Sequence, residues 1–185
     1  MKKTLLLLLC IIMAMGMQAQ TQTQEHLKFM GIPLDGTISQ FHSKLLAKGF
    51  KYDDESSFSG VREYNGIFSG KDAIIFVYYN TSSKIVYRAK AAIKRDTENL
   101  IKKEYDDFKR LLSTKYKDAY IMDDEQEDYP SCTIFISNLS DDILGTIGLY
   151  ISKHGPSYDE VYALHIDYED LANEKANEDE RLEDL

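Results

Sequence analysis

The stretch from Phe29 to Phe50 constrains the fold most strongly, because it predicts a strand, a turn and a helix that is closed at both ends. Thr37 followed three residues later by Gln40 is a capping box, in which the hydroxyl accepts a helical N–H and the amide reaches back. The apolar residues that follow at helical spacing are Ile38, Phe41, Leu45 and Leu46. Gly49 can adopt the left-handed conformation that ends a helix. This stretch predicts a fold and carries no reactive group.

Two segments with alternating apolar residues predict a β-hairpin. Residues 73–79 have apolar side chains on both faces, with Ile74, Phe76 and Tyr78 pointing one way. Residues 84–93 alternate, with Arg88 and Lys90 outward and a core face made of Ile85, Tyr87, Ala89, Ala91 and Ile93. Because residues 80–83 read as a turn, we expect the two strands to pair.

The remaining elements complete an α+β protein. A long helix is expected from Asp96 or Thr97, with an apolar stripe of Ile101, Tyr105, Phe108, Leu112 and Tyr116. Further strands are predicted at residues 50–52, 61–68, 120–122, 133–137, 146–152 and 161–168. In the last strand Tyr162, Leu164, Ile166 and Tyr168 form the core face.

These elements suggest two related helix-plus-antiparallel-sheet units, β-α-β-β-β then β-α-β-β-β, packed as one compact domain over residues 20–166. The units would span residues 27–92 and 93–166. Leu45-Leu46 followed by Phe50 matches Leu111-Leu112 followed by Tyr116. The helix caps and the leucine pairs are spaced differently, so duplication and chance similarity both stay open.

Residues 1–19 predict a secretory signal peptide. Lys2 and Lys3 precede the apolar run 5–12, and Ala19 is a small residue at a plausible cleavage point. The run is too short for a membrane span, which needs about 20 residues. Cys10 lies inside this run with no small residue before it, which argues against a lipoprotein. We therefore expect export to the periplasm or the extracellular space, without a transmembrane span.

The net charge is −9, and acidic residues gather in residues 167–185. The chain has no basic stripe, so neither nucleic acid nor an anionic membrane is an expected partner. The acidic tail is almost entirely polar, which predicts a frayed helix or disorder that adds little to stability.

Motifs for cofactors and nucleophiles are missing from the sequence. Without the leader, Cys132 is the single cysteine, which excludes an intramolecular disulfide. The acidic loop at residues 123–128 does not have the spacing of a calcium loop. There is no glycine-rich phosphate loop, paired zinc spacing or nucleophile elbow, so no cofactor is expected.

The tyrosines favour a non-enzymatic binding or interaction module of unknown ligand. Those in or beside predicted strands that we assign to binding are Tyr79, Tyr87, Tyr150 and Tyr158. Outward tyrosines on a sheet are rigid contacts for a protein, peptide or glycan of the cell envelope. The competing interpretation is that tyrosine suits strands generally.

An alternative function is a hydrolase or metal-dependent enzyme centred on His165, Asp167 and Glu169, which share one face of a strand. A histidine with two carboxylates can ligate a metal or form a base with its orienting acid, and His154 lies across a possible hairpin. The competing interpretation is the wet face of an edge strand.

Four motifs carry a resemblance: Phe29-x-Gly31-Ile32-Pro33-x-Asp35-Gly36, Leu45-x-x-Lys48-Gly49-Phe50, Gly66-x-Phe68-x-Gly70 and Leu112-x-x-Lys115-Tyr116. Together they resemble small, uncharacterised exported proteins of Bacteroides-type bacteria, whose function is unknown. The resemblance implies a compartment and a fold only. The helix-then-sheet architecture also resembles the tandem modules of bacterial β-lactamase inhibitor proteins, which implies no function.

Overall fold

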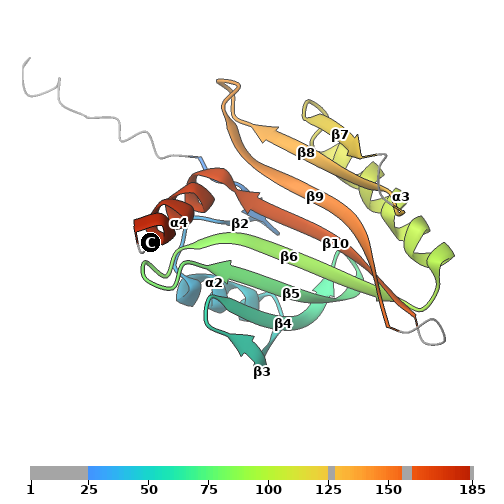
Figure 1. The fold of residues 1–185 in the computed structure, drawn as a ribbon, viewed down its shortest axis with the longest axis horizontal. Helices are drawn as coiled ribbons and strands as arrows, with labels where there is room; N and C mark the ends of the chain where they lie inside the picture. The colour runs from blue at the N-terminus through green and yellow to red at the C-terminus, as the bar shows by residue number, and fades with distance from the viewer. Residues whose placement is uncertain (1–24, 125–127, 156–159, 184–185) are drawn as a thin grey trace, which may run out of the picture.

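The structure is a computed structural model that describes residues 25–124, 128–155 and 160–183. The predicted signal peptide, Tyr158 and the last two residues of the acidic tail lie outside the described residues. Within the described residues the chain forms an eight-stranded antiparallel sheet, a short hairpin and three helices (Figure 1). These elements confirm the predicted α+β class.

The strand order in the sheet is β3-β4-β5-β6-β10-β9-β8-β7. The strands are β3 (Lys51–Phe58), β4 (Val61–Phe68), β5 (Lys71–Tyr79), β6 (Val86–Arg95), β7 (Tyr120–Asp124), β8 (Ser131–Ser137), β9 (Ile143–His154) and β10 (Val161–Asp170). A separate hairpin consists of β1 (Lys28–Phe29) and β2 (Ile32–Pro33). The sheet is made of two meanders, β3–β6 and β7–β10, which join where β6 pairs with β10.

Helices α2 (Ile38–Ala47) and α3 (Glu98–Lys115) pack on one face of this sheet and lie behind it in Figure 1. The predicted capping box is present at Thr37 and Gln40. The helix residues that enter the core are Ile38, Phe41 and Leu45 from α2 and Ile101, Tyr105, Phe108 and Leu112 from α3. Leu46 is 43% exposed and stays outside it. The helical spacing of apolar residues therefore predicted most of the buried positions in α2 and α3.

The central strands follow the predicted alternation except at one bulge. In β10, Tyr162, Leu164, Ile166 and Tyr168 are buried against the helices, as expected. The predicted pairing of β5 with β6 is confirmed, but its register shifts between Tyr78 and Tyr79. The bulge places Val86 in the core, whereas Ile85 and Tyr87 remain half-buried.

The number of strands in each unit and the ends of two strands differ from the predicted pattern. Each of α2 and α3 is followed by four strands, as in the strands predicted one by one, whereas the repeat pattern β-α-β-β-β counted three. β3 continues beyond the predicted end at residue 52 to Phe58, and its pairing with β4 is irregular between Asp53 and Phe58. β10 runs to Asp170, so the predicted start of the tail at residue 167 falls inside a strand.

The acidic tail forms helix α4 (Leu171–Glu183), which packs at one end of the sheet against β6, β9 and β10. Asn173 donates hydrogen bonds to the carbonyls of Leu34 and Val86, and the buried Asn177 contacts Asn80. A frayed or disordered tail was therefore the wrong expectation for the described part. Amide hydrogen bonds, rather than an apolar stripe, attach this helix.

Candidate functional site

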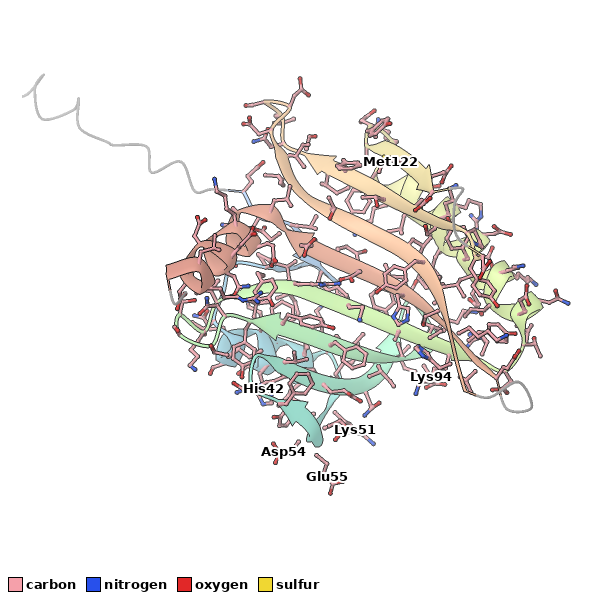
Figure 2. All side chains as sticks on the ribbon, in the orientation of Figure 1. His42, Lys51, Asp54, Glu55, Lys94 and Met122 are labelled. Atoms are coloured by element: carbon pink, nitrogen blue, oxygen red, sulfur yellow. The ribbon has the colours of Figure 1, made fainter. Side chains whose placement is uncertain are left out.

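The face of the sheet opposite α2 and α3 is the candidate functional site, and we call it the open face. Side chains alternate across a strand, so the neighbours of the buried core residues point to this face. At its centre lie Phe76 and Tyr78 of β5, Arg88 and Lys90 of β6, His165 and Asp167 of β10, and Tyr150 and Ser152 of β9. The sheet edges flank these residues, with Lys51 and Met122 at opposite sides (Figure 2).

An ion pair joins the two meanders on the open face. Arg88 Nε donates to Asp167 Oδ1 at 2.8 Å, and a second guanidinium nitrogen contacts the other carboxylate oxygen. Asp167 is 6% exposed, so the fork geometry of Arg88 satisfies a buried charge. The same contact raises the pKa of Arg88. The guanidinium carbon also lies 5.0 Å from the ring centroid of Tyr78.

His165 is a buried, neutral imidazole beside this pair. Its ring stacks on Tyr150 with the centroids 4.7 Å apart, and its Nε2 lies 2.7 Å from Ser152 Oγ. The same hydroxyl lies 2.9 Å from His154 Nε2, so Ser152 bridges two histidines. Burial, followed by the charge of Lys90, lowers the pKa of His165 to about 4. Among the described residues, its buried Nδ1 has no hydrogen-bond partner.

Lys90 adds a second cation to the aromatic side chains. Its Nζ lies 5.2 Å from the ring centroid of Phe76 and 5.7 Å from that of Tyr78. The open face therefore presents two cations that are each held over aromatic rings. Such contacts hold long side chains in defined positions.

Of the predicted binding tyrosines that the structure describes, Tyr79 and Tyr87 line one pocket beside α4, and Tyr150 lies apart from them. Tyr150 lies on the open face, whereas Tyr79 packs against the core. Tyr87 lies near α4, and burial followed by the nearby Glu174 raises its pKa. Sequence reasoning assigned no site role to Phe76, Tyr78, Arg88 or Lys90. The alternation of residues 84–93 had placed Arg88 and Lys90 outward, whereas residues 73–79 were apolar on both faces and did not show which side Phe76 and Tyr78 occupy. The register of β5 with β6 brings the four together.

The residues of the alternative enzyme site are only partly brought together. His154 and His165 meet at Ser152, but the Asp167 carboxylate is bound to Arg88, and Glu169 lies opposite Arg88 in the register. Within the described segments, no group of three or more histidine, cysteine, aspartate or glutamate residues is arranged to hold a metal ion. β10 lies at the centre of the sheet, so these residues do not form a wet edge strand either.

Comparison of the chain with protein-family models, with curated proteins and with solved structures finds no match. No helix in the part of the chain that the structure describes is long and apolar enough to cross a membrane.

Proposed function

We propose that the protein is an exported, non-enzymatic binding module whose open face contacts a partner protein in the cell envelope. The observation that carries the proposal is the row of aromatic and cationic side chains that α2 and α3 leave uncovered. The row consists of Phe76, Tyr78, Arg88, Lys90 and Tyr150.

The composition of this row suits protein recognition. Tyrosine and arginine are enriched among the residues that contribute most binding energy at interfaces. Phe76, Tyr78 and Tyr150 are half-buried in the free protein, and their neighbours already restrict them. Little side-chain entropy would be lost when such residues bind a partner.

We also propose that the protein contains two copies of one structural unit, α2 with β3–β6 and α3 with β7–β10. Each helix is followed by a four-stranded meander, and the meanders meet at β6 and β10. The open face would then span both units, with the Arg88–Asp167 ion pair at their junction. A partner that binds at this junction would contact both units.

Site-specific photocrosslinking tests the proposed interface. A photoreactive phenylalanine derivative at Phe76 would probe the open face, and the same group at Leu100 is a matched control on α3. Leu100 is 51% exposed on the helix side of the molecule. We expect one discrete crosslinked protein from position 76 in intact cells and none from position 100. Equal crosslinking at both positions, or none at position 76, would contradict the proposal.

The metal-dependent alternative has less support, because Asp167 is already bound to Arg88. Metal analysis of the protein purified without chelators distinguishes the two functions. Stoichiometric metal that is lost in His154→Ala and His165→Ala variants would favour the enzyme over the binding module.

A further inference from the structure

An apolar groove of about 310 Å³ lies on the helix side of the sheet, away from the open face. Three parts of the chain meet there over β10: the turn between β1 and β2, the turn between β4 and β5, and the last two turns of α3. Its lining includes Met30, Phe68, Phe108, Leu111, Tyr168 and Lys115. Small-molecule sites are typically concave, mostly apolar and about 300 to 1,000 Å³ in volume. The groove therefore has room for a small ligand.

Stacked aromatic rings make the walls of the groove rigid. Phe68 stacks on Phe29 of the β1–β2 hairpin at 5.5 Å and on Phe108 of α3 at 6.0 Å. Tyr168 of β10 meets the edge of Phe29 at 5.3 Å. These contacts tie the hairpin, the sheet and the helix together. The groove is thus formed before any ligand arrives.

Met30 occupies a backbone conformation that does not suit it. Its φ is 51° and that of Gly31 is 78°, which are the signs needed in a tight hairpin turn. Asparagine or glycine is favoured at the Met30 position, and other residues are strained there. The Met30 side chain lines the groove. Backbone strain of this kind often accompanies a functional role of the side chain.

Lys115 supplies a charge at the rim of the groove. Its Nζ lies 4.8 Å from the ring centroid of Tyr116, and no acidic side chain among the described residues pairs with it. An apolar groove with one exposed ammonium group at its rim is complementary to an aliphatic chain that ends in an anionic group. A groove at the lower end of the usual size range favours a medium-length chain.

We propose that this groove binds a medium-chain aliphatic carboxylate, with its tail against Phe68, Phe108 and Leu111 and its carboxylate at Lys115. The site is independent of the proposed interaction face, because it lies on the other side of the sheet.

Calorimetric titration of the purified protein with octanoate, below its micelle concentration, tests the proposal. We expect one saturable site that a Leu111→Gln substitution weakens at least about fivefold, because apolar contact is lost. Leu100→Gln is the matched control, since Leu111 and Leu100 are 45% and 51% exposed on the same helix. Absence of saturable binding, or an equal loss in both variants, would overturn the proposal.

Two further variants test the roles of the turn and of the charge. Met30→Asn suits the turn and removes the groove side chain, so it should keep the fold intact and weaken octanoate binding. Lys115→Met should weaken octanoate about two- to fivefold, as for an exposed ion pair, and leave 1-octanol binding unchanged. If Lys115→Met weakened both probes equally, or if Met30→Asn left octanoate binding unchanged, the assigned contacts would be wrong.

Discussion

Asp170 and His26 are separated by 144 positions in the sequence, yet Nδ1 of His26 lies 3.0 Å from the Asp170 carboxylate. The same carboxylate accepts hydrogen bonds from the backbone N–H of Leu27 at 2.9 Å and from that of Asn173 at 3.1 Å. One buried side chain thus attaches the N-terminal segment and caps the start of α4. The N-terminal hairpin and the C-terminal helix share this anchor.

Replacing Asp170 with alanine should lower the free energy of unfolding by about 3 kcal/mol, because buried N–H groups lose their acceptor. Urea unfolding measures this loss. Asp179→Ala, which changes an exposed aspartate of α4, is the control and should have almost no effect. A loss below about 1 kcal/mol in Asp170→Ala would show that the anchor is not important for stability.

Truncation after Leu171 should lower the melting temperature by roughly 5 °C, in contrast to the expectation from composition that the tail adds little. Without α4, the buried Asn80 loses its contacts with Asn177 and Glu180. A cost of about 2 kcal/mol corresponds to several degrees in a domain of this size. Thermal unfolding monitored by circular dichroism provides the measurement. Asn177→Ala should reproduce part of the loss, whereas the exposed Glu178→Ala should not.

Substitution of Arg88 by methionine should destabilise the protein by about 2 to 3 kcal/mol, because the Asp167 carboxylate would remain buried without its partner. Replacing both residues, as in Arg88→Met with Asp167→Leu, should recover most of the loss. Denaturant unfolding of Arg88→Met, of Asp167→Leu and of the double variant completes a double-mutant cycle with the wild type. Additive effects would show that the two residues do not act as a pair.

His165 should make the folded protein less stable in mild acid. Its pKa is about 4 in the folded protein, whereas the unfolded chain has a value near 6.5. The unfolded chain therefore binds more protons between these pH values, and the free energy of unfolding falls as the pH drops from about 6.5 toward 4. Between pH 7 and pH 5 the loss from this residue should be about 2 kcal/mol.

The variant His165→Gln isolates this contribution, because the carboxylates titrate in the same way in both proteins. Its stability should fall less than that of the wild type between pH 7 and pH 5. An equal fall in the two proteins would place the folded pKa of His165 close to its ordinary value. Direct titration of the imidazole by NMR checks the same quantity.

Gly145 and Gly148 offer a matched pair on β9. A Cβ at Gly145 would overlap the backbone oxygen of Glu169, whereas one at Gly148 would lie at least 3.7 Å from its nearest neighbours. Gly145→Ala should therefore cost about 3 kcal/mol through displaced backbone, and Gly148→Ala much less. Chemical denaturation of both variants measures the difference. Similar losses would show that strand propensity, and not steric overlap, sets the cost.

The helices and most strands could be predicted from local patterns. Thr37, Gln40 and Gly49 determine the ends of α2 through groups only a few residues apart, and hydrophobic period separates helix from strand. The alternation in residues 84–93 also placed Arg88 and Lys90 on the outward face, whereas the two apolar faces of residues 73–79 left the side of Phe76 and Tyr78 undecided. The α+β class followed from these elements alone.

The arrangement of the candidate sites depends on contacts between distant segments. Pairing of β6 with β10 brings Arg88 to Asp167, and the bulge at Tyr78 exchanges Tyr87 for Val86 in the core. The spacing of apolar residues along the sequence cannot predict which strands pair or where a bulge occurs, because both depend on long-range hydrogen bonds. The tail was misjudged for the same reason, since Asn173, Asn177 and Asp170 stabilise α4 through polar contacts that leave no apolar stripe. Local chemistry thus determined the elements, and only the tertiary structure decided which side chains meet.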